Sequence, residues 1–72
     1  MISSNALRRL DSHTVLVTTR ESTVIKGSAD SVRGGYFKLT GPESLSPRGE
    51  MVPIAGYVLI AIADISYIQV VV

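Results

Sequence analysis

Arg33-Gly34-Gly35-Tyr36 is the stretch of this chain with the clearest chemical potential, because two glycines separate a cation from an aromatic ring. Arginine contacts phosphate, and an aromatic face stacks on an unpaired base, so the stretch has the side chains that single-stranded nucleic acids use. It is not the phosphate loop of a nucleotide-binding enzyme, because the required strand, glycine spacing and following helix are missing. The stretch is therefore a candidate for contact with a single-stranded nucleic acid.

The other reactive side chains do not predict catalysis. Asp11, Ser12 and His13 are adjacent in sequence, whereas the fold brings the members of a catalytic triad together from separate places. One histidine and no cysteine leave no thiolate or multi-histidine zinc site. Metal-loop spacing is also missing among the acidic residues Asp30, Glu43, Glu50 and Asp64. We expect a protein that is not an enzyme and has no metal, no cofactor and no small-molecule substrate.

Two groups of side chains each allow two interpretations. The three tyrosines are either packing and interface residues or platforms for bases: Tyr36, Tyr57 and Tyr67. Arg8 and Arg9 either face solvent or contact phosphate.

Size and composition favour association with other chains. A single domain over residues 1–72 is small enough to bury only about 60% of its unfolded surface, and without cysteine it has no disulfide to stabilise it. Hydrophobic residues make up 46% of the chain, which is more than so small an interior can bury. All seven Lys and Arg lie in residues 1–50, so electrostatic contacts must come from that part.

The apolar run at 51–72 is interrupted by Pro53, Gly56 and Asp64, whereas a membrane helix needs roughly 20 apolar residues without a break. No signal peptide is visible in the sequence. We expect no membrane association and a cytoplasmic location.

The elements that must position these residues are mostly strands. Capping by Ser3, Ser4 or Asn5 predicts a short helix at 6–10. Gly27 lies inside an expected strand, where it marks a sharp bend or a close backbone approach. Two prolines and two glycines make 41–50 a variable surface loop. The first three expected strands are 13–19, 23–30 and 36–40, with a loop at 31–35 between the second and third.

The run at 51–72 alternates with a period of two, which predicts a long strand at 52–62, a turn at Asp64 and a last strand at 65–72. Both faces of these strands are apolar, so both need cover, one of them from another molecule. A strongly bent sheet of five strands closes into a small barrel. The expected fold class is therefore all-β, a small five-stranded barrel with a short N-terminal helix.

The order and spacing of these residues from Leu7 to Val70 resemble the Sm-like (LSm) family. Its first motif is similar to Val15-Leu16-Val17, Gly27 and Phe37-Lys38-Leu39, and its second motif is similar to the run from Val58 to Ile68. The resemblance implies an SH3-type barrel that assembles into a homo-oligomeric ring of about five to seven subunits. It also implies single-stranded RNA held at the pore of the ring.

The chain departs from the family pattern at the residues that usually clamp the bases. Val32 to Tyr36 stand where an Asp and an Asn are usual, and Ala61-Ile62 replace Arg-Gly. We therefore expect weak RNA binding, the alternative being a scaffolding ring that binds protein. The resemblance gives as candidate nucleic-acid-binding residues Arg33, Gly34, Gly35, Tyr36, Ala61 and Ile62. It gives as candidate oligomer-interface residues Val58, Ile60, Ile65, Tyr67, Ile68 and Val70.

Overall fold

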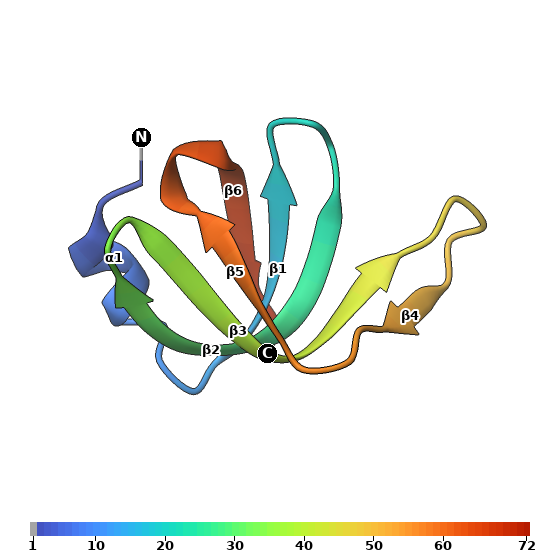
Figure 1. Cartoon of the computed structure of the whole chain (residues 1–72), viewed down its shortest axis with the longest axis horizontal. Coiled ribbons are helices and arrows are strands. Elements are labelled where there is room, and N and C mark those ends of the chain that lie inside the picture. Colours follow the sequence, from blue (N-terminus) through green and yellow to red (C-terminus); the bar gives the residue numbers. More distant parts are fainter. Residues whose placement is uncertain (1) are drawn as a thin grey trace.

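The computed structural model describes residues 2–72 as a short helix beside a strongly bent antiparallel sheet (Figure 1). The all-β expectation with a short N-terminal helix is confirmed. The elements, in chain order, are α1 (Ser4–Arg8), β1 (Thr14–Thr19), β2 (Val24–Arg33), β3 (Tyr36–Leu45), β4 (Met51–Pro53), β5 (Tyr57–Ala61), the 3-10 helix η1 (Ile62–Asp64) and β6 (Ile65–Val70).

Helix α1 begins two residues before the expected start of 6–10. Ser3 is its N-cap, and the Ser3 side-chain oxygen accepts a hydrogen bond from the Ala6 backbone N–H at 3.1 Å. Such a cap satisfies one of the free N–H groups of the first turn. The helix is short, and it is held by Leu7, which is 1% exposed and belongs to the core.

The turn between β2 and β3 is tighter than the expected loop at 31–35. β2 continues to Arg33 and β3 begins at Tyr36, so only Gly34 and Gly35 connect them. Their φ angles are +56° and +80°. Positive φ at both central residues is what a two-residue hairpin requires, and glycine adopts it without strain. The loop prediction was wrong because Ser31 to Arg33 still pair with β3.

The expected surface loop at 41–50 was also wrong in its first half, because β3 runs through Gly41 and Pro42 to Leu45. The β2–β3 register shifts between Lys26 and Ser28 at this place. Such a bulge accommodates the positive φ of Gly41 and the missing N–H of proline. The Pro42 carbonyl accepts a hydrogen bond from the Ile54 N–H at 2.9 Å. The connection that remains is Ser46–Glu50.

Gly27 confirms the prediction of a close backbone approach. A Cβ atom at this position would lie 3.0 Å from the Leu39 Cβ and 3.1 Å from the Thr40 carbonyl oxygen. A side chain here would have to push Leu39 or the Thr40 backbone away by a few tenths of an ångström, so the close approach of β2 to β3 favours glycine.

The expected strand at 52–62 is two strands, because the chain bends between Pro53 and Tyr57 and Gly56 has a φ of +82°. Both halves pair with β3, β4 with its C-terminal end and β5 with its N-terminal end. Together they take the place of the single fourth strand of the expected barrel. β6 ends at Val70, two residues before the expected end.

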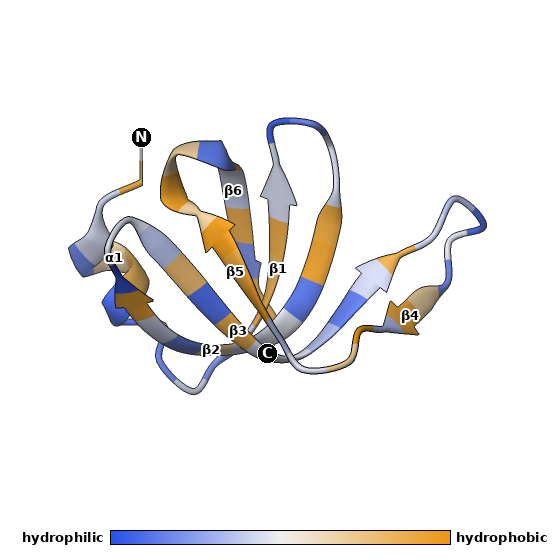
Figure 2. Ribbon diagram, in the orientation of Figure 1, coloured by the Kyte–Doolittle hydropathy of each residue, from blue (hydrophilic) through white to orange (hydrophobic). Residues whose placement is uncertain are grey.

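The sheet order is β4-β3-β2-β1-β6, with β5 paired to β3. Within residues 2–72, β4, β5 and β6 each have one edge that pairs with no strand, and the barrel is open between β5 and β6. Hydrophobic residues alternate with polar ones along most strands, whereas β5 is almost wholly hydrophobic (Figure 2). The core consists of Leu7, Val15, Val17, Ala29, Phe37, Leu39, Ile60, Ile62 and Ile65.

No helix within residues 2–72 is long and apolar enough to cross a membrane. The cytoplasmic location stays a prediction.

Candidate nucleic-acid interface

The β2–β3 turn lies directly beside the start of η1, although the two are far apart in sequence. The Ile62 N–H donates a hydrogen bond to the Gly35 carbonyl oxygen at 2.9 Å. Tyr36 faces Arg33 on β2 and Ala61 on β5. The fold therefore brings together all six candidate residues at one end of the barrel.

These six residues differ in what they can offer a ligand. Arg33 is exposed and Tyr36 is 49% exposed, so both side chains are free to bind. Ala61 is half-buried. Ile62 is 7% exposed and belongs to the core, because it continues the inward row of Val58 and Ile60. The prediction for Ile62 is thus wrong for its side chain, and only its backbone lies at this end.

The η1 turn is held from the opposite side by the connection between β1 and β2. The Arg20 Nε donates to the Ala63 carbonyl oxygen at 2.9 Å, and the Arg20 N–H donates to the Asp64 carbonyl oxygen at 2.9 Å. Asp64 thus contributes its backbone at this contact. These bonds give the turn a fixed support, a role of Arg20 that the sequence analysis did not identify.

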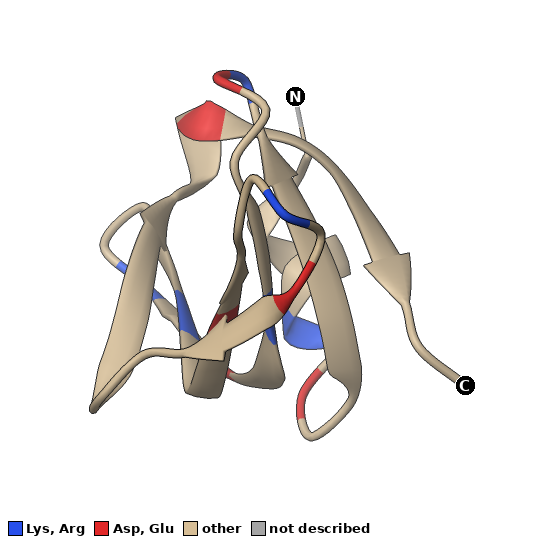
Figure 3. Ribbon diagram, turned by 90° about the vertical axis from the view of Figure 1, so that its right-hand side faces the viewer, with Lys and Arg blue, Asp and Glu red and all other residues tan. Residues whose placement is uncertain are grey.

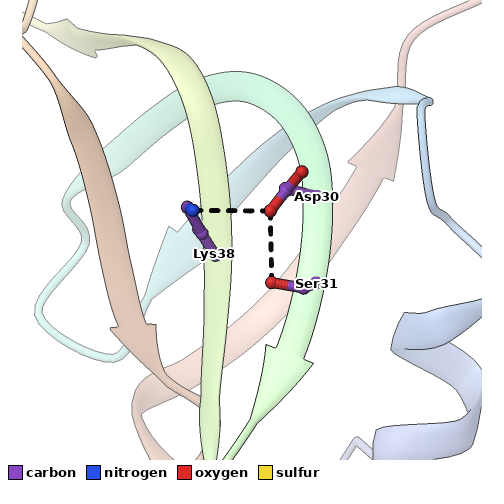
Figure 4. A network of polar contacts seen from close by, with 3 residues as sticks. All are labelled: Asp30, Ser31 and Lys38. Carbon is purple, nitrogen blue, oxygen red and sulfur yellow. Dashed lines mark hydrogen bonds and ion pairs between the residues drawn. The ribbon is translucent and has the colours of Figure 1, made fainter.

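A second set of exposed side chains lies on the outer face of β2, β3 and β5. Lys38 pairs with Ser31 on one side and Leu59 on the other. Its Nζ lies 4.4 Å from the centre of the Tyr57 ring and 3.6 Å from Asp30 Oδ2 (Figure 4). The Ser31 hydroxyl donates to the same carboxylate oxygen at 3.2 Å (Figure 4). The sequence analysis missed Lys38 and Tyr57 as partners, because the β3–β5 pairing is what brings them together.

The expected interface residues lie along the two open edges, but not all of their side chains are available. Ile60 is 5% exposed and Ile65 is 3% exposed, so both belong to the chain's own core. The three half-buried residues that pack against that core are Val58, Ile68 and Val70. Tyr67 is 59% exposed and faces outward. Leu59, at 53% exposed, is an edge residue that the sequence analysis omitted, although its alternation with Val58 and Ile60 indicates an outward position.

The residues Asp11, Ser12 and His13 form a turn after α1. His13 Nδ1 lies 3.2 Å from the carbonyl oxygens of Leu10 and Asp11, so its ring contacts backbone. In the part of the chain that the structure describes, no group of His, Cys, Asp or Glu side chains is placed to hold a metal ion.

Charge is spread over the molecule. The positions of Lys and Arg and those of Asp and Glu are both scattered along the ribbon (Figure 3).

Comparison with solved structures identifies the fold. A heptameric archaeal Sm protein superimposes with a TM-score of 0.79 at 22% identity, over 93% of this chain and 97% of the other. The chain has the Sm fold. The P. aerophilum SmAP1 heptamer gives a TM-score of 0.80 at 20% identity, over 99% of this chain and 97% of the other. The Pyrococcus abyssii Sm protein in complex with a uridine heptamer gives a TM-score of 0.78 at 18% identity, over 99% of this chain and 100% of the other.

At the level of sequence, no known family and no curated protein matches the chain. The Sm fold is therefore carried here by a sequence in which few positions coincide with those of its structural neighbours.

Proposed function

We propose that the protein assembles into a homo-oligomeric ring that binds single-stranded RNA weakly at its pore. The observation that carries the proposal is the pair of open edges on β5 and β6, in a fold shared with heptameric Sm proteins. An open hydrophobic edge invites the addition of a strand from another molecule. Pairing of β5 with β6 of the next subunit satisfies both edges once the ring closes.

We propose seven subunits, because two of the solved structures are heptamers. A repeated interface of this kind places the β2–β3 turn and η1 of every subunit around one opening. Arg33 and Tyr36 are a poor site alone, but seven copies raise the effective concentration and convert weak contacts into measurable avidity. The structural neighbour crystallised with a uridine heptamer supports oligouridine as the first ligand to test.

The assembly is tested by light scattering coupled to gel filtration at micromolar concentration. We expect one species of seven 7.7 kDa subunits. A monomer, or an open-ended series of sizes, overturns the ring. In a second arm, Ile68→Lys places a charge beside the core at the β6 edge, opposite Val17. Burial of that charge should remove both fold and ring, and a well-folded monomer would show that the two are separable.

RNA binding is tested by fluorescence anisotropy with labelled oligouridine and oligoadenine at two salt concentrations. Tyr36→Ala should weaken binding with little change in salt dependence, because stacking contributes about 1–3 kcal/mol per base. Arg33→Ala should reduce the salt dependence, because each phosphate contact releases counterions. Neither change should break the ring. Absence of binding at tens of micromolar ring contradicts the proposal.

The second candidate function is a scaffolding ring that binds protein. It is favoured by the interspersed charges (Figure 3), by the net charge of +1, and by Ala61-Ile62 in place of the usual clamping pair. Absence of RNA binding would favour this alternative, whereas an Arg33→Ala/Tyr36→Ala double variant that binds RNA as well as the unchanged protein would exclude the pore as the RNA site.

A further inference from the structure

The outer face of β2, β3 and β5 has a hollow that the pore does not explain. It has a volume of about 220 Å³ and is lined by Ser31, Arg33, Tyr36, Lys38, Tyr57 and Leu59. Two of its walls are tyrosines that are 49% and 58% exposed, and a third is Leu59, which is 53% exposed. So much half-exposed apolar surface beside two cations is typical of sites that bind flat, charged ligands.

The two tyrosines are attached at separate places along the sheet. Tyr57 faces Thr40, which is four residues beyond Tyr36 along β3, and this corresponds to about 13 Å of strand. Lys38 lies between them, two residues from Tyr36 on the same face of β3. Each ring can therefore take its own base, with the base at Tyr57 on the ring face that Lys38 does not cover, while the lysine lies near the phosphates between the bases.

Lys38 is already held in place for such a contact. Its ammonium lies over the Tyr57 ring at 4.4 Å and pairs with the Asp30 carboxylate at 3.6 Å (Figure 4). The Asp30 carboxylate also accepts a hydrogen bond from Ser31. These contacts position the Lys38 side chain. The Asp30 carboxylate also offsets part of the positive charge of Lys38, so Asp30 opposes the binding of an anionic ligand.

We propose that this face is a second contact site for single-stranded RNA, with Tyr36 and Tyr57 as stacking platforms and Lys38 as the phosphate ligand. The stacking of successive bases on aromatic side chains along a positively charged groove is how sequence-tolerant single-strand sites work. The inference rests on the proposed function for its ligand class, and it extends the RNA path from the turn onto the outer face of the sheet. The pairing of β5 with a neighbour's β6 leaves this face open, because the added strand lies beside β5 and does not cover it.

The main test is binding of a labelled twelve-residue oligouridine to the assembled protein. Tyr57→Leu keeps an apolar side chain but removes the ring, and it should lower affinity about fivefold or more, the effect of losing one stacked base. The control is Leu45→Ala, which removes an exposed apolar side chain outside both the hollow and the β5 and β6 edges and should leave affinity unchanged. Light scattering on both variants shows whether assembly is retained.

Two variants test the charges. Lys38→Met should reduce the slope of log affinity against log salt by about 0.7, the share of one single-strand phosphate. Asp30→Asn should tighten binding a few-fold, because it removes the carboxylate that opposes the phosphate. A purely structural role of the Lys38–Asp30 pair would give no gain from Asp30→Asn, and that outcome overturns the assignment.

Cross-linking separates this site from the pore. Oligouridine carrying 5-iodouridine is irradiated with the protein, and the cross-linked residues are mapped by mass spectrometry. Cross-links at Tyr57 support the outer site. Cross-links confined to Tyr36, with Tyr57→Leu neutral, overturn it and leave the pore proposal standing. Binding that depends on Tyr57 and Lys38 but not on Arg33 contradicts the pore and keeps the outer site, whereas no RNA binding overturns both.

Discussion

The inner and outer faces of the β3–β5 pair use alternate residues of the same two strands and have opposite chemistry. Phe37 and Leu39 on the inner face are 1% and 0% exposed, whereas Tyr36 on the outer face is 49% exposed. On β5, Ile60 is 5% exposed and Tyr57 is 58% exposed. The inner row stabilises the fold, and the outer row is free to contact a ligand. Substitutions on the two faces should therefore affect different measurements.

The largest difference should come from Phe37→Ala on the inner face. Truncating a buried phenylalanine costs about 3–5 kcal/mol of unfolding free energy, which is a large part of the stability of a domain this small. The measurement is urea unfolding followed by circular dichroism, at one fixed protein concentration because any assembly in the sample would contribute to stability. The outer-face control Tyr36→Ala should cost less than about 1 kcal/mol. Equal losses would break the distinction between the faces.

Substitution at the β2 bend, at Gly27, should lower the free energy of unfolding nearly as much. Gly27→Ala puts a methyl group 3.0 Å from the Leu39 Cβ and 3.1 Å from the Thr40 carbonyl oxygen. We expect a loss of about 1–3 kcal/mol in the same urea experiment, the usual cost of overpacking. Ser28→Ala, at the next and half-buried position of β2, is the control and should be close to neutral. A neutral Gly27→Ala would show that the bend does not depend on the missing side chain.

A smaller effect is expected where α1 covers one end of the inner face. Ser3→Ala removes the hydrogen bond that the cap accepts from the Ala6 N–H, and loss of an N-cap costs about 1 kcal/mol. The helix anchors Leu7 in the core, so the loss should appear in global unfolding. Ser3→Asp restores a capping oxygen and should recover most of the stability. If Ser3→Asp were no better than Ser3→Ala, the cap would not be the cause.

The smallest effect on stability should come from Lys38→Met on the outer face. The Lys38–Asp30 pair is solvent-exposed, with side chains 34% and 45% exposed, and such pairs contribute between about 0 and 1 kcal/mol. The free energy of unfolding should therefore change by less than about 1 kcal/mol. The slope of log RNA affinity against log salt should still fall by about 0.7. A loss of several kcal/mol would mean that the outer face also stabilises the fold.

Much of the fold follows from local chemistry that can be predicted from the sequence. β1 corresponds to the strand expected at 13–19, and an interior glycine indicated the bend at Gly27, whereas the single strand expected at 52–62 is divided into β4 and β5. The β2–β3 turn was predicted too long because its length depends on whether Ser31 to Arg33 pair with β3. That pairing is a tertiary contact, which local sequence rules do not determine. The strand at Gly41–Leu45 was missed for the same reason, since a bulge there accommodates a proline that local rules place in a loop.

The candidate site was predictable only in part. Arg33 and Tyr36 stood out because two glycines set them apart. Tyr57 could not be joined to Lys38 without the β3–β5 register, which pairs residues about twenty positions apart. Ile62 was placed at the site by resemblance, but the inward alternation that begins at Val58 puts its side chain in the core.

The hairpin of β3 and β4 projects from the barrel as an arm that closes on itself (Figure 1). Its tip is fixed by its own hydrogen bonds, from the Ser46 N–H to the Glu50 carbonyl oxygen at 2.7 Å and from the Gly49 N–H to the Ser46 carbonyl oxygen at 2.9 Å. The arm can thus change length without disturbing the core. Two residues added to each of its strands would keep every side chain on its present face of the hairpin. One residue added to each strand would move the side chains beyond the insertion to the opposite face. The tip is therefore a natural point at which to insert and display a peptide.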